Sequence, residues 1–445
     1  MNENRKDRRS MSIPSKRLVR LGYVGSMAVG IAGNMALNGV AQLGQGQRPV
    51  IKDLLLTPRN ITRITNQLAK LRGAAMKIGQ LISMDSGDLL PPELAQIMAP
   101  LRDSAYCMPP AQLKQVLNTQ WPQGWLKEFK KFDVHPIAAA SIGQVHRAQL
   151  KDGRDLAIKV QYPGVAESID SDVANVGVLM RISGLLPKGF ELTTYLDEAR
   201  KQLHEETDYT AEAAHLCNVK ALLNDMPRFV VPNLHKDWST PSILAMDYIS
   251  GIPIEDAALE PQEVRNKIAA DLIELTLSEL FKFGYMQTDP NFGNYLYQQD
   301  TRQIVLLDFG ATRRIDPVII DQYRRFLYAG LADNPETLII IAQEIGFVSA
   351  ETRDDHRTHI LRMIRLVFAV INDVSYIDFT NHKLPKQLQA DGLALIEDGF
   401  TPPPLPIDIL LLQRKFAGIF LLSSRLAATV DVAQILQRYL CIPNR

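Results

Sequence analysis

Three residues in the second half of the chain have types and a spacing that suit phosphoryl transfer. Asp289 and Asn294 form a D-x4-N pattern, and after a short apolar hairpin Asp308 opens the tripeptide Asp308-Phe309-Gly310. In kinase-type chemistry the first aspartate accepts or orients the proton of the attacking hydroxyl, while the asparagine and the second aspartate hold Mg²⁺ against the phosphates of ATP. We therefore expect Asp289 to be catalytic and Asn294 and Asp308 to bind the metal. Taken singly, each could equally be an ordinary Asp or Asn of a turn or a solvated loop aspartate.

A lysine in an upstream strand fits the same chemistry. Lys159 stands in Ala157-Ile158-Lys159-Val160, the kind of strand whose lysine contacts the α- and β-phosphates. Such a lysine needs a carboxylate partner on the following helix, and Glu212 is the candidate that we favour. Taken alone, Lys159 reads as an exposed residue at a sheet edge, and Glu212 as part of an acidic helix face.

Two usual kinase features are absent from the sequence. No G-x-G-x-x-G precedes the lysine, and Ala138, Ala139, Ala140 and Ser141 take its place. Alanine allows a backbone less freedom than glycine does. No A-P-E follows Asp308, and helical sequence begins almost at once, so the usual platform for a peptide substrate is missing. Phosphorylation of proteins on Ser or Thr is thus the weakest of the enzymatic readings.

The pattern of apolar residues indicates the elements that would position these groups. Strand-like runs at 145–150 and 156–161 flank a turn and predict a β-hairpin. Helical sequence covers 168–225 with a break near Pro187. Strands are expected at 228–231 and 242–246, and a small hairpin at 295–297 and 304–307. Elsewhere the chain is helical from 53 to 133 and beyond Pro261.

Composition limits the classes of function. The 445 residues include 49 Lys and Arg against 49 Asp and Glu, and 46% are apolar. A net charge of zero argues against nucleic acid as a partner. Three widely spaced cysteines exclude a disulfide scaffold and offer no zinc-binding spacing. An ordinary globular protein of a reducing compartment is expected.

The N-terminus is a basic tail followed by an uncharged segment. Residues 1–20 carry seven basic and two acidic groups, and residues 21–47 carry no charge. Many glycines and amides weaken the segment as a membrane-spanning helix. We expect a peripheral membrane contact, with a single span as the alternative. Ala28, Ala32 and Ala36 form a small-xxx-small face that suits a homodimer.

Together these motifs resemble the UbiB family of atypical kinase-like proteins, called the ADCK group in animals. The matching motifs run in family order from about residue 55 to 330: Lys77-Ile78-Gly79-Gln80 for K-x-G-Q, the alanine-rich loop Ala138 to Gln144, Lys159, Glu206-Thr207-Asp208 for E-x-D, Glu212, Asp289 to Asn294, and Asp308. Thr288-Asp289-Pro290-Asn291-Phe292 departs from the A-D-P-H-P of many members, and this departure bears on subfamily rather than activity.

The resemblance implies several further expectations. The K-x-G-Q helix would fold over the active site in place of a peptide, with Lys77 and Gln80 reaching the nucleotide and Glu206 and Asp208 bracing them. The family supports ubiquinone biosynthesis through a membrane-linked ATPase or small-molecule kinase activity. A membrane lipid or quinone precursor would then be the substrate, and other ubiquinone-biosynthesis enzymes would be partners. The location would be cytoplasmic on a membrane surface, or mitochondrial in a eukaryote.

We expect an α+β, bilobal protein-kinase-like fold with an added N-terminal helical extension. The segments would be 1–52 (basic tail and apolar segment), 53–133 (K-x-G-Q extension), 134–250 (small lobe) and 251–445 (helical large lobe). Met246 and Tyr248 would lie in the hinge, where the backbone meets the adenine. A nucleotide-gated scaffold that presents quinone precursors with little catalysis is the alternative function.

Overall fold

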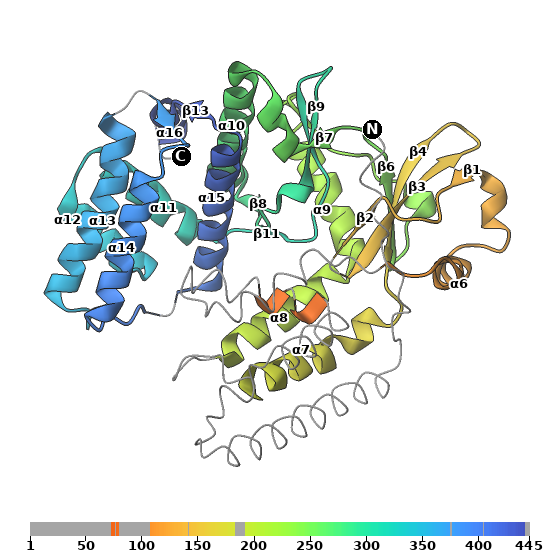
Figure 1. Ribbon diagram of the computed structural model, residues 1–445, viewed down its shortest axis with the longest axis horizontal. Coiled ribbons are helices and arrows are strands. Elements are labelled where there is room, and N and C mark those ends of the chain that lie inside the picture. The colour runs from red at the N-terminus through yellow and green to blue at the C-terminus, as the bar shows by residue number, and fades with distance from the viewer. Residues whose placement is uncertain are drawn as a thin grey trace, which may run out of the picture. The chain divides into compact units, whose positions relative to one another are not determined.

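The computed structural model describes residues 73–75, 77–79, 107–140, 142–182, 192–373, 376–403 and 405–440. They divide into two compact units (Figure 1). The first, here the sheet unit, holds the described residues up to Cys217 together with Pro232–Ile249. The second, here the helical unit, holds Asn218–Val231 and the described residues from Ser250 onward.

The sheet unit is built on an antiparallel sheet with the strand order β1-β3-β4-β6, and β2 pairs with β3. The strands are β1 (Phe129–Phe132), β2 (Ala138–Ala139), β3 (Gly143–Leu150), β4 (Asp155–Gln161) and β6 (Ile243–Asp247). The expected hairpin is confirmed as β3 and β4. Its turn contains Gly153 at φ +97°, a left-handed conformation that favours glycine.

Aromatic side chains form much of the core beneath this sheet. Helix α6 (Pro110–Gln120) contributes Leu113 and Leu117, and the residues that follow it contribute Trp121 and Trp125. The rings of Trp121 and Trp125 meet edge to face with centroids 5.0 Å apart, a preferred aromatic geometry. The first strand, β1, was not expected from the sequence, and it forms because its Phe129 packs into this cluster.

Three helices follow the hairpin, in yellow and light green in Figure 1. They are α7 (Val165–Ile182), α8 (Leu192–Glu206) and α9 (Tyr209–Leu222). Asp208 begins α9, since its carboxylate accepts the backbone N–H groups of Thr210 and Ala211 at 3.0 and 2.9 Å. Helix α9 starts in the sheet unit and continues into the helical unit at Asn218.

The helical unit contains most of the remaining helices. They are α10 (Gln262–Leu277), α11 (Pro317–Leu331), α12 (Pro335–Ile345), α13 (Asp354–Asp373), α14 (Lys383–Glu397), α15 (Ile407–Arg425) and α16 (Val432–Leu440), with a π-helical turn at Ser278–Phe283. Helices α11 and α12 each start with proline after an Asp or Asn cap.

Small sheets in the helical unit support the loops that carry the acidic residues. One has the order β5-β10-β9-β7, with β5 (Phe229–Val230), β7 (Ile252–Pro253), β9 (Tyr295–Gln298) and β10 (Gln303–Leu306). The others pair β8 (Tyr285–Gln287) with β11 (Thr312–Arg314), and β12 (Ile377–Asp378) with β13 (Thr429–Val430). The strand expected at 228–231 therefore does not join the sheet of the small lobe. It pairs in parallel with β10, where Phe229 lies opposite Ile304.

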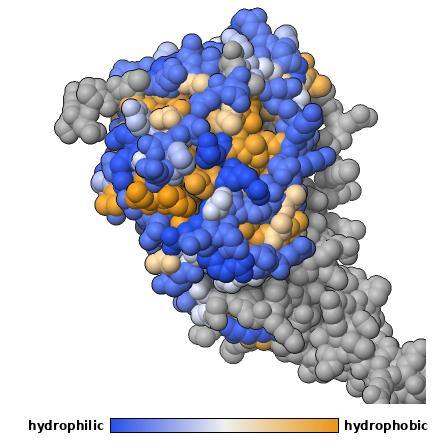
Figure 2. Space-filling view, turned by 90° about the vertical axis from the view of Figure 1, so that its left-hand side faces the viewer, coloured by the Kyte–Doolittle hydropathy of each residue, from blue (hydrophilic) through white to orange (hydrophobic). Residues whose placement is uncertain are grey.

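The face of the helical unit that carries α12, α13 and α14 is mixed in polarity. Exposed apolar side chains there include Ile340 on α12 and Leu393 and Ile396 on α14. Figure 2 looks onto this side and shows apolar patches separated by hydrophilic residues. Among the described helices, none has both the length and the apolar composition needed to cross a bilayer.

Candidate active site

A buried ion pair joins β4 to α9 in the sheet unit. The ammonium of Lys159 donates to both carboxylate oxygens of Glu212, at 2.7 and 2.9 Å. Glu212 is 2% exposed and Lys159 8%. Two desolvated charges contribute little net stability even when well paired, because the loss of hydration offsets their attraction. The pair thus places a cation at a fixed position beside the alanine-rich loop, as binding of a phosphate would require.

A second buried lysine comes from the K-x-G-Q motif. Lys77 is 5% exposed, and its ammonium lies 2.5 Å from Glu206 at the end of α8. The structure therefore brings Lys77 and the first acid of the E-x-D motif together. Asp208, the second acid, caps α9. Gln80 lies outside the described residues.

The alanine-rich loop is a tight turn of backbone over the sheet. Ala138 and Ala139 form β2 and pair with β3, and the N–H of Ala140 donates to Gly143 at 2.9 Å. Ser141 lies outside the described residues. Gly143 is required by space, because a Cβ there would sit 2.5 Å from the carbonyl oxygen of Val160. At Gly143, β3 thus lies closer to the backbone of β4 than a side chain at that position would permit.

A chain of buried hydrogen bonds fixes the end of this loop, and no pattern in the sequence predicts it. His146 is fully buried, and its Nδ1–H donates to the carbonyl of Asp133 at 2.8 Å, so its Nε2 must accept from the Gln144 amide at 2.8 Å. The Gln144 oxygen accepts the N–H of Met108 at 2.7 Å. Burial lowers the pKa of His146 to about 4, and the ring is therefore neutral at pH 7.

The expected hinge residues lie at the end of β6. Met246 is buried, and the N–H of Tyr248 donates to the carbonyl of Asp155 at 2.8 Å, while Arg147 covers the ring of Tyr248 at 4.1 Å. The intervening Asp247 binds the ring of His235 at 2.7 Å. These contacts hold the last strand of the sheet unit firmly to its neighbours.

In the helical unit, the hairpin β9–β10 brings the two expected metal ligands to the same end. Asn294 directly precedes β9, Asp308 follows β10 by two residues, and Tyr295 lies opposite Leu306 in the register. The N–H of Leu307 also donates to the carbonyl of Asn294 at 3.0 Å. One carboxylate and one amide side chain, whose oxygens are of the type that Mg²⁺ prefers, therefore extend from adjacent backbone.

Asp289 shares this end of the hairpin and has a partner that the sequence did not reveal. The Asn294 amide donates to the carbonyl of Asp289 at 3.3 Å. Arg414, on α15, donates to the carboxylate of Asp289 at 2.6 Å. The same helix packs Gly418 against Pro290, so closely that a Cβ would lie 2.3 Å from the proline. Helix α15 therefore belongs to the site, although it lies more than 100 residues further along the chain.

A fully buried charge lies beside Arg414 on α15. Lys415 is 0% exposed, and its ammonium lies 3.2 Å from Glu279 and 3.1 Å from the hydroxyl of Tyr295. Burial alone would lower the pKa of Lys415, but the charge of Glu279, the polar oxygen of Tyr295 and the hydrogen bonds to both together hold that pKa above its usual value. Lys415 is therefore a permanent cation that ties α15 to the start of β9.

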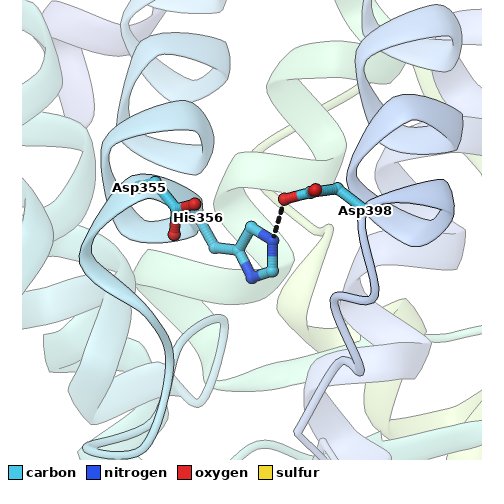
Figure 3. Close-up of side chains that lie close together, drawn as sticks. All are labelled: Asp355, His356 and Asp398. Carbon is cyan, nitrogen blue, oxygen red and sulfur yellow. Dashed lines mark hydrogen bonds and ion pairs between the residues drawn. The ribbon is translucent and has the colours of Figure 1, made fainter.

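A separate cluster of Asp355, His356 and Asp398 has side chains of the types that bind metals, with one ligand atom from each lying within 4.8 Å of the others (Figure 3). His356 Nε2 lies 2.9 Å from Asp398. Arg353 donates to the carboxylates of both Asp355 and Asp398 and supplies the positive charge that a cation would bring. We read the cluster as a clamp between the start of α13 and the end of α14.

Comparison with known proteins places these features in a family. The ABC1 atypical kinase-like domain matches residues 100–340. The atypical kinase COQ8, mitochondrial, of Saccharomyces cerevisiae is 39% identical over 438 residues, which cover 97% of this chain and 87% of that protein. The chain belongs to the ABC1 atypical kinase-like family. A second family member, the mitochondrial atypical kinase COQ8B of Rattus norvegicus, is 35% identical over 96% of this chain and 81% of its own length.

A solved structure supports the same assignment. The complex of Rv3197 with erythromycin, from Mycobacterium tuberculosis, has a TM-score of 0.60 and 26% identity, covering 84% of this chain and 95% of that one. The fold is therefore kinase-like, with mixed helix and sheet, as expected. The expected membership of the UbiB family, with an atypical kinase-like role in ubiquinone biosynthesis, is confirmed by these relatives.

Proposed function

We propose that this ABC1-family protein binds Mg-ATP and transfers or hydrolyses its terminal phosphate in support of ubiquinone biosynthesis at a membrane. The observation that carries the proposal is the shared end of the β9–β10 hairpin, where Asn294 and Asp308 leave adjacent backbone and the carbonyl of Asp289 accepts a hydrogen bond from the Asn294 amide. Oxygen ligands for Mg²⁺ and a carboxylate for the attacking hydroxyl or water are what phosphoryl transfer needs from a protein.

Each residue has a defined part in this proposal. Asn294 and Asp308 hold Mg²⁺, and Asp289 orients the nucleophile. Lys159, kept in place by Glu212, neutralises the phosphates. Lys77, Ala138, Ala139, Ala140 and Met246 supply further contacts to the nucleotide. The magnesium ion, when bound, neutralises charge that develops on the phosphoryl oxygens.

The acceptor is proposed to be water or a hydroxyl of a membrane lipid or quinone precursor. A polyprenyl chain is costly to bring into water, so an enzyme acting on it works at the bilayer surface. The basic and uncharged N-terminal segments, which lie outside the described residues, would make that contact.

Binding of Mg-ATP is the direct test. Equilibrium binding of a fluorescent ATP analogue to the full chain is compared with and without Mg²⁺, for wild type and for Lys159→Ala and Asp308→Asn. We expect Mg²⁺ to tighten binding to wild type, Asp308→Asn to lose that Mg²⁺ effect, and Lys159→Ala to weaken binding in both conditions. Equal affinity of wild type for the ATP analogue with and without Mg²⁺ would contradict the assignment of Asn294 and Asp308 as metal ligands.

The contact between Arg414 and Asp289 favours a second function. A guanidinium on the carboxylate competes with a substrate hydroxyl for the same oxygen. In that case the chain is a nucleotide-gated scaffold that presents quinone precursors to partner enzymes. It would bind Mg-ATP as above, with turnover no faster in wild type than in Asp289→Ala.

A further inference from the structure

Gln287, the last residue of β8, touches both acidic loops of the candidate site. Its side-chain oxygen accepts the N–H of Asp289 at 2.7 Å, and its side-chain amide donates to the carbonyl of Asp308 at 2.8 Å. Gln287 is 7% exposed. A single buried amide group therefore connects the backbone of the loop with the proposed catalytic carboxylate to the backbone of the loop with the proposed metal ligand.

The backbone of Gln287 is itself held on two sides. Its N–H donates to the buried carboxylate of Glu279 at 3.3 Å, and Glu279 pairs with Lys415 on α15. Gln287 also lies opposite Thr312 in the β8–β11 pair. The backbone that carries the bridging amide is thus held by Glu279 and by the pairing with Thr312, which lie outside both loops.

We propose that Gln287 is a positioning residue that sets the separation between the Asp289 loop and the Asp308 loop. The inference rests on the proposed function, since it concerns the geometry in which Mg²⁺ and the nucleophile meet. Mg²⁺ demands ligands at about 2.1 Å in nearly octahedral geometry. A displacement of about 1 Å at a reacting centre can cost about 100-fold in rate.

The chemistry of the amide explains why this position needs glutamine. The bridge requires one acceptor, for the N–H of Asp289, and one donor, for the carbonyl of Asp308. A glutamate has the shape but, when ionised, only accepts, and it would face the Asp308 carbonyl with like partial charge. A methionine offers neither function. A neutral histidine offers one donor and one acceptor on opposite sides of its ring.

The experiment uses the full chain and the variants Gln287→Met, Gln287→Glu and Gln287→His. Gln303→Met is the matched control, because Gln303 lies in β10 of the same unit and donates to a backbone carbonyl, that of Pro227, at 2.6 Å. Four quantities are measured: the rate of ATP turnover, the Mg²⁺ concentration for half-maximal turnover, the affinity for Mg-ATP, and the midpoint of thermal unfolding.

We expect Gln287→Met to lower turnover by about 10- to 100-fold and to raise the Mg²⁺ midpoint several-fold, with thermal unfolding close to that of Gln303→Met. Gln287→Glu should be at least as impaired, and Gln287→His should recover much of the lost turnover. The control should turn over ATP like wild type. Wild-type turnover and Mg²⁺ dependence in Gln287→Met would overturn the proposal, as would a histidine variant no better than methionine.

Failure of the proposed function gives a different result. If wild type binds Mg-ATP without turnover, the Mg²⁺ dependence of nucleotide affinity becomes the readout, and Gln287→Met should still weaken it while Gln303→Met does not. If wild type shows no Mg²⁺-dependent nucleotide binding at all, the proposed function and the role of Gln287 both fall.

Discussion

Arg414 donates a hydrogen bond to the carboxylate of Asp289 across 2.6 Å, although 125 residues separate them in the chain. The guanidinium is a rigid, always charged donor, and it fixes the rotamer of the carboxylate it holds. Helix α15 therefore sets the orientation in which the Asp289 carboxylate would meet a nucleophile.

Removal of the guanidinium should therefore impair catalysis without abolishing nucleotide binding. We expect Arg414→Ala to lower ATP turnover by about tenfold, a fraction of the 100- to 10,000-fold that a positioned acid or base contributes. Arg414→Lys keeps the positive charge but loses the planar guanidinium, so its ATP turnover should lie between that of wild type and that of Arg414→Ala. Steady-state turnover and nucleotide affinity measure both effects, and an Arg414→Ala that turns over faster than wild type would show that the contact is inhibitory.

The packing of α15 on the same loop gives a stability prediction. A Cβ at Gly418 would lie 2.3 Å from Pro290, so Gly418→Ala must push α15 and the loop apart. We expect unfolding free energy to fall by about 1–3 kcal/mol and turnover to fall with it. Gly392 on α14 has nothing within 4 Å of such a Cβ, and Gly392→Ala should instead gain about 0.5–1 kcal/mol. Urea denaturation of both variants tests these two predictions, and equal changes in unfolding free energy would contradict them.

Variants of the Lys159–Glu212 pair can distinguish a role in stability from a role in nucleotide binding. Glu212→Gln removes the negative charge that accepts two hydrogen bonds from the buried ammonium of Lys159, and it should cost about 3–5 kcal/mol of unfolding free energy. Replacing both residues, as Lys159→Met with Glu212→Gln, should restore most of that loss. The nucleotide affinity of the double variant should nevertheless be lower than that of wild type, because the Lys159 ammonium proposed to bind the phosphates is gone. Wild-type affinity in the double variant would mean that the pair serves only the fold.

The buried His146 predicts a pH dependence of stability. Its pKa is about 4 in the folded protein, because burial disfavours the charged ring, and about 6.5 when unfolded. The unfolded state therefore binds more protons between these values, and stability is lost as pH falls from 6.5 toward 4, by about 3 kcal/mol at most. Urea unfolding at pH 5.0 and 7.5 should show a smaller difference in His146→Gln than in wild type. An identical difference would remove His146 as the source.

Local signals in the sequence predict local structure well here. The alternation of residues around Lys151-Asp152-Gly153 indicates the β3–β4 hairpin, since the turn glycine and the strand pattern lie within a few residues of each other. The order of Asp289, Asn294 and Asp308 along one short hairpin predicts their convergence for the same reason.

Contacts between distant segments could not be predicted in this way. Strand β5 joins β10 through a parallel pairing over 75 residues, between Phe229 and Ile304, and no local pattern specifies the partner of a short apolar strand. Arg414 reads in the sequence as an ordinary polar residue in an apolar helix. Its function depends on which loop α15 packs against, and that is decided by Gly418 and the buried Lys415.

Phosphate release from Mg-ATP by the purified full chain, with and without anionic liposomes, shows whether the protein is an enzyme that uses Asp289 when wild type is compared with Asp289→Ala. We expect turnover by wild type that rises with liposomes and is lost in Asp289→Ala, while both proteins still bind nucleotide. Turnover by Asp289→Ala at the wild-type rate would contradict this expectation.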